Sequence, residues 1–582
     1  MKAVKNSKFY LSVLVLVLGC IVAGQVWGKG SKYSYEDIIR LEKVVNKISE
    51  FYVEEIDSED LVESAIEGLR TVLDPHTAYF TEKDYTNLRV STEGKFGGLG
   101  ITIAIRDKIL TIISPLQGTP AFRMGLQAGD KILEIEGKST KGITIEGAVE
   151  QLRGVPGTKV TIKVYRIGVA ESMEFTVVRD IIRIKSVPFA TIIKDGVGYV
   201  KVTQFSKNTT QDLETKIKNL KKQGLTSLIL DLRNNPGGLL NQAIDVSSLF
   251  LDKGQLVVYT QGRTMQQNRK YHSRRKGLWN KDHRLVVLVN AGSASASEIV
   301  AGAVQDHDRG LIMGKPSFGK GSVQTILPLD AQKYALKLTT AYYYTPSGRC
   351  INKAENAVRS NNKKAETDSL GKDSTKFFLT DSGRKMYAAG GITPDVSIDG
   401  RMYARYIREM ERKTMFFQYV VKNRLKIEKA GKVTQNYKVS KKMLKNFKNY
   451  VYADTSFVKF KSASHMVLED FGSTLKKERK ALGDTVETAK SKEIDTLNKK
   501  LAKLLEANTK LEFGRNEEYI KYGLKRELLK AVLGDSAQYV HELTLDKQVI
   551  EAMEYLTDEK KYAKAFHLSK VEEKKSVKKK KK

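Results

Sequence analysis

The chain has 582 residues, 41% of them hydrophobic, so it is long enough to bury several cores. Its 44 glycines and only 10 prolines exclude collagen-like and proline-rich disordered chains. Lys and Arg number 100 against 67 Asp and Glu, a net charge of +33, which raises nucleic acid or anionic membrane as partners. Residues 401–582 hold 44 basic and 25 acidic residues, or +19, so the charge is concentrated in the C-terminal third.

The first 28 residues predict an export signal. Three lysines among the first eight residues precede an apolar run from Phe9 to Val22, and small residues follow it. The run is short for a membrane span of about 20 residues, and we expect cleavage near Gly24 or Gly28. An uncleaved membrane anchor and a lipid on Cys20 are the alternatives. We therefore expect an exported protein of the bacterial periplasm or cell envelope.

Cys20 and Cys350 are the only cysteines. Removal of the signal leaves Cys350 alone, so the exported chain relies on core burial rather than on an internal disulfide. An exported protein does not meet the genome, and we expect no nucleic acid partner. The positive charge then indicates envelope surfaces, acidic protein partners or solubility.

In chain order, residues 30–92 predict a small helical domain, because apolar residues recur at spacings of three and four from Tyr35 to about Thr81. Residues 93–182 change to short alternating strands with glycine turns between them, and they enclose one helix at Ile145–Arg153.

Residues 183–400 predict buried strands, each followed by a helix. The apolar runs Ser227–Leu232 and Leu285–Val289 are typical of strands covered on both faces. The helices Leu239–Leu251 and Ala296–Gln305 follow them, and a third strand lies at Leu311–Met313. This alternation indicates an α/β layer.

The segment at about 354–382 is polar and irregular, which predicts an exposed insertion. Residues 401–570 read as a basic helical extension, and the Lys-rich tail 571–582 as solvated chain. The simplest interpretation of the extension is a solvated accessory helical domain. Dimerisation, holding of substrate and contact with anionic membrane are the alternatives.

A glycine-rich stretch, Phe96–Ile101, offers several backbone amides to bind a terminal carboxylate, although a tight turn entering a strand is the simpler interpretation of this stretch alone. With the Gly118–Gly137 segment, the helix and the closing strand, it resembles a PDZ domain. That resemblance implies binding of C-terminal peptides as an added strand, with Leu99, Gly100 and Ile101 in the carboxylate-binding loop.

Asn290–Glu298 lies between a predicted strand and a predicted helix, a placement that exposes a serine hydroxyl as a nucleophile requires. Helix capping by Ser295, with Glu298 completing a capping box, is the alternative. Asp231–Gly238 occupies the equivalent turn after the preceding strand. Its amides are candidates for stabilising an oxyanion, although the segment could equally be a plain turn.

Gly314–Gly321 nearly matches a phosphate-binding loop. It fails because Gly321 replaces the required Ser or Thr, and because Ser322–Pro328 reads as a strand where that loop must open a helix. Lys320 between two glycines can instead enter a covered site, where desolvation favours the neutral amine and makes it a candidate base. A surface lysine is the alternative.

Together these residues resemble the C-terminal processing peptidases, also called tail-specific proteases, over about Tyr35 to Val396. The matching motifs are Ser293–Glu298, Phe318–Gln324, Leu73–His76 and Gly390–Asp395. The resemblance implies a multidomain α+β chain: a small helical N-terminal domain, a PDZ domain, a crotonase-like α/β protease core and a helical C-terminal extension.

The resemblance also implies the catalytic roles. Ser295 would be the nucleophile, Lys320 the general base and Gln324 the residue that orients the lysine. The oxyanion hole would come from backbone amides of Ala296 and of the Gly237–Gly238 turn, and spacing does not decide between the two glycines. No metal or cofactor is required.

Histidine would be the alternative base. His307 lies twelve residues after Ser295, which along a helix is about 18 Å, so we interpret Asp306–Arg309 as structural.

The leading hypothesis is therefore an exported serine endopeptidase that selects proteins or peptides with free C-termini. A noncatalytic PDZ scaffold with a protease-like core is the alternative, and a crotonase-like enzyme acting on acyl thioesters is a third. Every motif position needed for peptide cleavage is filled, which favours the enzyme. Homo-oligomerisation and gating by the PDZ domain are left open.

Overall fold

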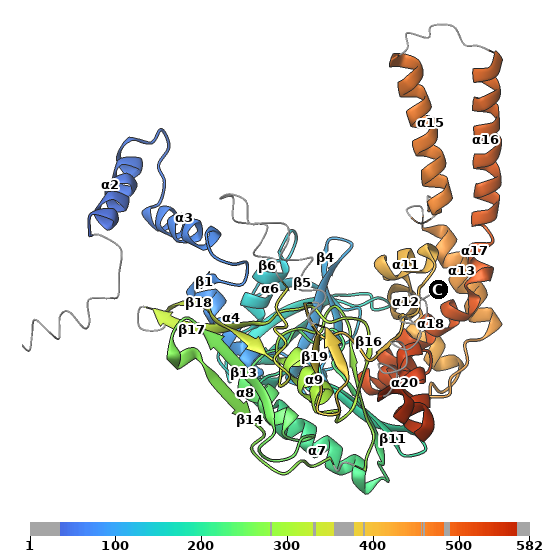
Figure 1. Ribbon diagram of the computed structural model, residues 1–582. Helices are drawn as coiled ribbons and strands as arrows, with labels where there is room; N and C mark the ends of the chain where they lie inside the picture. Colours follow the sequence, from blue (N-terminus) through green and yellow to red (C-terminus); the bar gives the residue numbers. More distant parts are fainter. Residues whose placement is uncertain are drawn as a thin grey trace, which may run out of the picture. The chain divides into compact units, whose positions relative to one another are not determined.

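The computed structural model describes residues 35–279, 282–329, 333–353, 377–387, 390–454, 457, 460–481 and 489–566, and Figure 1 labels its helices and strands. The predicted signal peptide, most of the predicted insertion and the Lys-rich tail lie outside these residues. Within the described ranges, no helix combines the length and apolar composition of a transmembrane span. The chain divides into two compact units, one formed by residues up to Tyr85 with Gln324–Thr339, the other by Thr86–Val323 and the chain from Thr340.

The first unit contains two amphipathic helices, α2 (Tyr35–Phe51) and α3 (Ser58–Thr71), neither of which has a buried residue. The expectation of a helical pattern up to about Thr81 is wrong after Thr71, where α3 ends. The Asp74 carboxylate accepts hydrogen bonds from the backbone N–H groups of His76 and Thr77, at 2.8 and 3.2 Å, and this turn stops the helical pattern. Strand β1 (Ala78–Phe80) follows and pairs with β18 (Tyr334–Tyr344).

The second unit begins within α4 (Glu82–Glu93) and continues into a small sheet, as the alternating pattern predicted. The strands are β3 (Ile101–Arg106), β4 (Ile109–Pro115), β5 (Lys131–Ile135), β6 (Lys138–Ser139), β7 (Lys159–Tyr165) and β8 (Met173–Val178), with helices α5 (Pro120–Arg123) and α6 (Ile145–Leu152). The sheet order is β3-β4-β5-β7-β8, with β6 beside β5, so β3 is an edge strand. Strands β2 (Lys95–Gly98) and β9 (Asp180–Arg183) pair with each other where the chain enters and leaves.

The predicted protease core is a six-stranded sheet in the order β10-β11-β12-β15-β16-β21, parallel from β11 onward and antiparallel at β10. These strands are Phe189–Lys194, Val197–Lys201, Ser227–Asp231, Leu285–Val289, Leu311–Gly314 and Val396–Ser397. Helices α7 (Thr209–Lys222), α8 (Leu240–Ser247) and α9 (Ala296–Asp306) connect them. The predicted α/β layer is confirmed.

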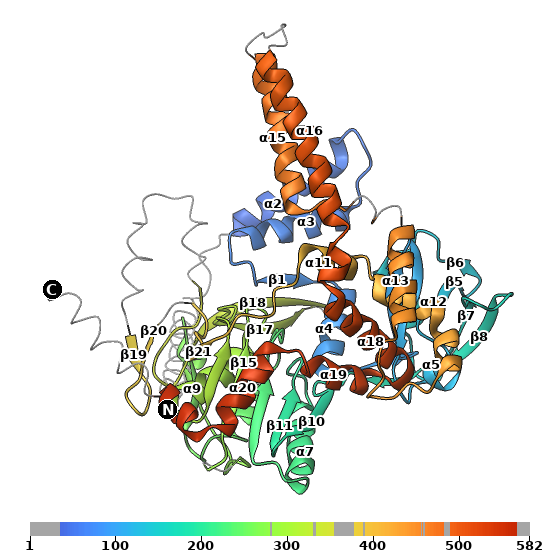
Figure 2. The ribbon, with the colours of Figure 1, turned by 90° about the vertical axis from the view of Figure 1, so that its right-hand side faces the viewer.

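The two faces of this sheet are covered by different parts of the chain. On β12, Leu228 and Leu230 join the core shared with α7, α8 and α9, whereas Ile229 points to the opposite face. That opposite face is covered by helix α20 (Lys547–Thr557), whose Val549, Ala552 and Leu556 are at most 1% exposed. Figure 2 shows α20 in front of the core strands. The interpretation of residues 401–570 as a solvated accessory domain is therefore wrong for α20, because its apolar side completes the core.

A second group of strands flanks the core. Strands β13 (Leu256–Gly262) and β14 (Arg269–His272) pair with each other, β13 pairs with β18, and β17 (Ser322–Leu329) also pairs with β18. The prediction of a strand, not a helix, at Ser322–Pro328 is confirmed. A short 3-10 helix (Met265–Gln267) lies in the β13–β14 connection, and β19 (Phe377–Leu379) and β20 (Lys385–Tyr387) form a hairpin.

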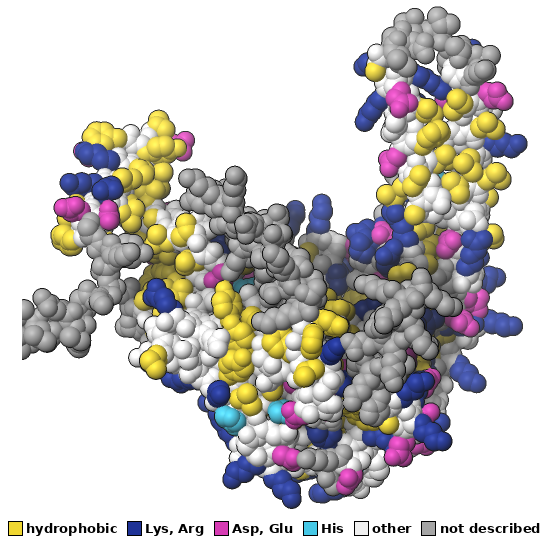
Figure 3. Space-filling model, viewed as in Figure 1, with side chains coloured by type: hydrophobic (Ala, Val, Ile, Leu, Met, Phe, Trp, Pro, Cys, Tyr) yellow, Lys and Arg dark blue, Asp and Glu magenta, His cyan; other side chains and the backbone are white. Residues whose placement is uncertain are grey.

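The rest of the C-terminal region is helical, as predicted. Its helices are α11 (Arg405–Arg412), α12 (Met415–Ala430), α13 (Lys441–Ala453), α15 (Ala463–Ala481), α16 (Ala489–Thr509), α17 (Glu512–Arg515), α18 (Glu517–Leu533) and α19 (Asp535–Leu543). An aromatic core that includes Phe416, Tyr419 and Phe447 holds several of them together. Helices α15 and α16 lie side by side in Figures 1 and 2, with apolar side chains exposed along them in Figure 3.

Candidate active site

Ser295 lies at the point where strand β15 passes through a short turn into helix α9. Its backbone has φ 54° and ψ −113°, a conformation that L-residues with a side chain rarely adopt and that costs about 1–3 kcal/mol. Helix α9 is buried along its whole length, whereas Ser295 itself is partly exposed. The fold thus holds one strained serine at the open end of a rigid helix, which is the placement of a nucleophile on a strand-to-helix turn.

The carboxylate of Glu298 joins the serine turn to the lysine loop. Its Oε2 accepts hydrogen bonds from the backbone N–H groups of Ser295, at 2.8 Å, and Lys320, at 2.9 Å. Its Oε1 accepts from the Ser317 hydroxyl at 2.5 Å and from the Gly319 N–H at 2.6 Å. The structure therefore brings the backbones of Ser295 and Lys320 to the same carboxylate oxygen, which sequence reasoning had considered only as half of a capping box.

Burial sets the protonation behaviour of this carboxyl group. Glu298 is 1% exposed, and burial raises its pKa above the ordinary value of a glutamate. The four hydrogen bonds act in the opposite direction, because each one favours the ionised form.

The loop around Lys320 is packed so tightly that its flanking residues must be glycines. A Cβ on Gly319, which has φ 88°, would lie 3.1 Å from the backbone of Gly390, and a Cβ on Gly321 would lie 2.4 Å from the Asn352 nitrogen. The Phe318 N–H also donates to the Ser293 carbonyl at 2.9 Å, a second link between the lysine loop and the serine turn. Lys320 is partly buried.

The glycine turn after β12 contacts the serine directly. Gly237 has φ 98°, and a Cβ built on it would lie 2.8 Å from the Ser295 Cβ and 2.9 Å from the Ala296 nitrogen. The Gly237 N–H donates to Asn235 Oδ1 at 2.9 Å, so this donor already has an acceptor within the turn. The N–H groups of Gly238 and Ala296 donate to none of the described residues. The predicted oxyanion residues thus lie beside Ser295.

The predicted peptide-binding loop lies at β3, the edge strand of the small sheet. Leu99 is 2% exposed, and its carbonyl accepts from the Ala121 N–H at 3.0 Å. Gly100 has φ 78°, and a Cβ there would lie 2.3 Å from Thr119, so only glycine fits. Ile101 begins β3, whose outer side carries no other strand of that sheet. An edge strand of this kind is what an added peptide strand requires.

Known proteins match the same segments. Residues 196–359 match Peptidase family S41, 87–165 a PDZ domain, 406–556 a probable PDZ-protease C-terminal helical domain, and 24–84 the activating protease CtpB N-terminal domain. A carboxy-terminal-processing protease of Bartonella bacilliformis is 41% identical over 348 residues, 59% of this chain and 79% of that protein. A carboxyl-terminal-processing protease of Synechocystis is 38% identical over 298 residues, 50% of this chain and 68% of that protein.

The chain belongs to peptidase family S41. Among solved structures, a photosystem II D1 C-terminal processing protease aligns with 26% identity and a TM-score of 0.33, over 63% of this chain and 94% of that one. The predicted order of helical domain, PDZ domain, protease core and helical C-terminal domain is confirmed.

In this S41 peptidase, Tyr343 is a neighbour of the serine that sequence reasoning missed. Burial raises the pKa of its phenol to about 12, and the nearby Ser295 side chain acts in the opposite direction. Its backbone N–H donates to the Gly321 carbonyl at 2.6 Å, next to Lys320. Tyr343 is one of three consecutive tyrosines in β18, and nothing in that pattern distinguishes it.

Two other candidate residues have different surroundings. Gln324 lies on β17 in the first unit, where its side-chain NH₂ donates to the Thr339 hydroxyl at 2.7 Å; its proposed role toward Lys320 stays a prediction. His307 has both ring nitrogens engaged, Nδ1 with Asp381 at 2.8 Å and Nε2 with the Leu256 carbonyl at 2.7 Å. These contacts agree with the structural interpretation of His307.

Proposed function

We propose that this S41 peptidase is an exported serine endopeptidase that recognises C-terminal tails through its PDZ domain and cleaves with Ser295 and Lys320. The observation that carries the proposal is Ser295 at φ 54° on the turn into α9, with the Gly237–Gly238 turn packed against it and Glu298 linking it to the lysine loop. The names of the relatives, which are carboxy-terminal-processing proteases, support the choice of substrate.

The chemistry follows from the roles of these groups. Neutral Lys320 takes the proton from the Ser295 hydroxyl as its oxygen attacks a peptide carbonyl, and Gln324 orients the lysine amine. The lysine then gives the proton to the departing amine, and water hydrolyses the acyl-enzyme. We assign the oxyanion contacts to the amides of Gly238 and Ala296, since the Gly237 amide donates to Asn235. One missing oxyanion donor typically costs about 10²–10³ in kcat.

The Ser-Lys assignment is tested with a fluorogenic peptide that has an apolar C-terminus. Ser295→Ala and Lys320→Ala should each abolish cleavage, whereas Lys315→Ala should leave it near the wild-type rate. Lys315 is the matched control, because it lies five residues before Lys320 and pairs with Asp399. Cleavage that survives Ser295→Ala, or is lost only in His307→Ala, would show that the assignment is wrong.

Tail recognition is tested by comparing the same peptide with a free and an amidated C-terminus. A carboxylate held in the Leu99–Ile101 loop should give the free acid the lower KM, because amidation removes the negative charge that backbone amides bind. Equal KM values for the two peptides would remove the PDZ carboxylate site from the proposal.

Export is supported by the basic start and apolar run of residues 1–28. N-terminal sequencing of the protein from a fractionated bacterial culture should place the mature start near Gly24 or Gly28. A chain that starts at Cys20 and carries labelled fatty acid would indicate the lipid anchor instead, and a chain that retains Met1 in the cytoplasm would contradict export.

A further inference from the structure

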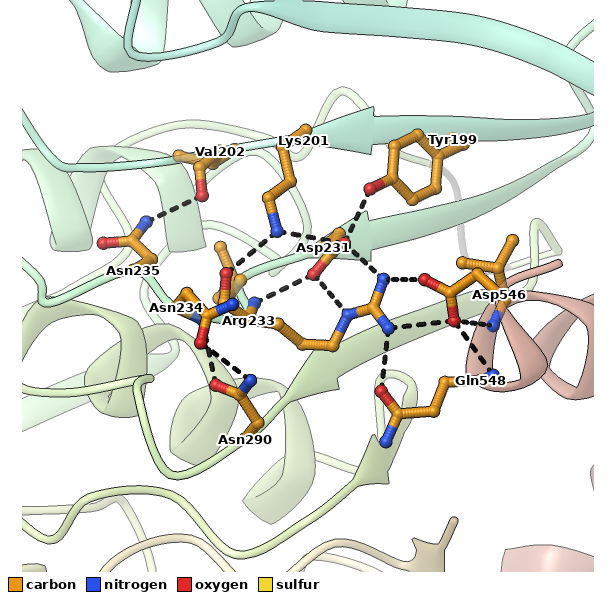
Figure 4. Close-up of polar contacts among 12 residues, drawn as sticks. Tyr199, Lys201, Val202, Asp231, Arg233, Asn234, Asn235, Asn290, Asp546 and Gln548 are labelled. Carbon is orange, nitrogen blue, oxygen red and sulfur yellow. Dashed lines mark hydrogen bonds and ion pairs between the residues drawn. The ribbon is translucent and has the colours of Figure 1, made fainter. Parts of the chain in front are cut away.

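A buried charge network lies at the root of the glycine turn that contacts Ser295 (Figure 4). Asp231, the last residue of β12, is fully buried, and its carboxylate accepts hydrogen bonds from the Tyr199 hydroxyl at 2.6 Å and from the Arg233 guanidinium at 2.7 and 3.0 Å. Lys201 Nζ lies 3.1 Å from Asp231 and donates to the Arg233 carbonyl at 2.9 Å. Burial raises the pKa of Asp231, but the charges of Arg233 and Lys201 outweigh it and hold the pKa well below the ordinary value.

The other side of the Arg233 fork is held by the C-terminal helical domain. Asp546 accepts from Nη1 at 3.0 Å and from Nη2 at 2.7 Å, and Gln548 Oε1 accepts from Nη1 at 2.7 Å. With Nε and Nη2 also donating to Asp231, two edges of the planar guanidinium are each bound to a carboxylate. Such a two-pronged geometry fixes the position of an arginine better than a single contact does.

Asp546 belongs to the helix that covers the sheet. It is the N-cap of α20, and its Oδ1 also accepts from the N–H groups of Gln548, at 3.0 Å, and Val549, at 3.2 Å. The Gln548 side chain in turn donates to the Ile398 carbonyl at 2.8 Å. Asp546 is therefore held by a helix whose apolar side is buried in the core, and it is a rigid partner for Arg233.

From Arg233 the chain leads directly to the amides beside the serine. Asn234 has φ 57° and exchanges hydrogen bonds with the Asn290 side chain at 2.9 and 3.0 Å. Asn235 donates to the Val202 carbonyl at 3.0 Å and accepts from Gly237. Because these contacts fix the backbone of the turn, we expect a displacement of Arg233 to move the amides next to Ser295.

We infer that Asp546 of the C-terminal helical domain is a positioning residue for catalysis, which holds Arg233 and through it the turn that presents the Gly238 amide to the oxyanion. The inference rests on the proposed function, because it takes Ser295 as the nucleophile and Gly238 as an oxyanion donor. It gives the helical domain a part in the reaction itself, beyond covering the sheet.

The test separates the Arg233 contact from the helix cap. Asp546→Ser keeps a good N-cap residue and removes the carboxylate, and Asp546→Asn keeps one acceptor oxygen. In the full-length protein we expect kcat to fall about tenfold or more in Asp546→Ser and less in Asp546→Asn, with KM within about twofold of wild type, since misplacement near a reacting group lowers kcat. Glu554→Gln is the matched control on α20, because Glu554 is exposed and its carboxylate pairs only with Lys561 among the described residues.

A fluorophosphonate probe that labels the reactive serine and a thermal melt are the second readouts. Slower labelling at an unchanged melting temperature is expected for Asp546→Ser. A wild-type kcat in Asp546→Ser would overturn the inference, and so would a loss of activity that is fully explained by loss of folded protein. Ser295→Ala in the same assay keeps the two claims distinct: if it still cleaves, the proposed function fails, and if it is inactive while Asp546→Ser is fully active, only this inference fails.

Discussion

The protease core places two strand-to-helix turns side by side, and they are stabilised in different ways. The turn after β15 carries Ser295 and is held by Glu298, three residues later in its own helix. The turn after β12 carries Gly237 and Gly238 and is held from a distance, by Val202, Asn290 and Asp546. The two turns also bind each other, since the Asn235 carbonyl accepts from the Ala294 N–H at 3.0 Å and the Ser297 hydroxyl at 2.9 Å. Ser295 is thus held by a contact within its own helix, whereas the amides of the neighbouring glycine turn are positioned by residues that are distant in the sequence.

The largest effect is expected where the local turn is broken. Glu298→Ala leaves the Ser295 and Lys320 amides without their acceptor, at about 1–3 kcal/mol for each buried donor, and we expect kcat to fall about 10²–10³-fold. The fall in kcat should be smaller in Glu298→Gln, because the amide oxygen can still accept a hydrogen bond. Peptide cleavage measures kcat, and a thermal melt measures the stability of each variant. Glu214→Ala is the control, because the Glu214 carboxylate pairs only with Lys218 of α7 and with Arg275 among the described residues. A folded Glu298→Ala with wild-type kcat would contradict local positioning.

The distant turn is tested at Gly237. An alanine there would place its Cβ 2.6 Å from the Ala294 carbonyl and 2.8 Å from the Ser295 Cβ, and we expect kcat to fall about 100-fold through loss of an oxyanion contact. Gly254→Ala is the matched control, since Gly254 has nearly the same φ, 88°, but nothing within 4 Å of an added Cβ. Gly254→Ala therefore introduces backbone strain without a steric clash. Equal losses of kcat in the two variants would show that strain, not proximity to Ser295, is responsible.

A change in the PDZ loop should leave the Ser295 turn and the glycine turn intact and should weaken only the binding of the peptide tail. Gly100→Ala would push a Cβ to 2.3 Å from Thr119, and we expect KM to rise about tenfold with kcat nearly unchanged, the mark of lost ground-state binding. Gly118→Ala is the control in the same region, with φ 80° and open space around the added Cβ. If Gly100→Ala lowers kcat instead, the PDZ domain controls the turns as well as binding the tail.

At the root of the distant turn we expect a clear effect on stability and a smaller fall in kcat than in Asp546→Ser, since Asp231→Asn keeps one acceptor oxygen for Arg233. Asp231→Asn removes one charge from a buried pair and should destabilise the core by about 3 kcal/mol at pH 7. Because the folded-state pKa of Asp231 lies below its ordinary value of 3.8, its stabilisation is present above that pH and is lost as pH falls toward the folded-state pKa. Denaturant unfolding followed by fluorescence of Trp279, which is buried in the core, should show the two proteins converging below about pH 4. A constant difference from pH 7 to pH 3 would contradict this.

The features that could be predicted are those whose causes lie close together in the chain. The uninterrupted apolar runs of β12 and β15 indicated strands covered on both faces, and the motif around Ser295 indicated the turn into α9. The three residues of β1 are too few to show a period, so the helical pattern was extended over them. The choice between Gly237 and Gly238 depends on where the Asn235 side chain points, which spacing does not contain.

The covering of the second sheet face also depends on contacts between distant residues. Val549, Ala552 and Leu556 lie on one side of a helix, a pattern that predicts burial without naming the surface that buries it. Their partner Ile229 is more than 300 residues earlier in the chain. In the same way, Asp546 reads as an ordinary helix cap until the structure shows Arg233 beside it.

The position of α20 in the chain has a consequence for biosynthesis. The ribosome completes β12, β15 and the serine turn long before it reaches residues 547–557, so the newly made core has one apolar face uncovered and Arg233 without Asp546. Helix α20, which covers that face of the sheet, is synthesised after both turns are complete. We therefore expect this protease to reach its full activity only after residues 546–557 have emerged from the ribosome, later than the serine turn itself.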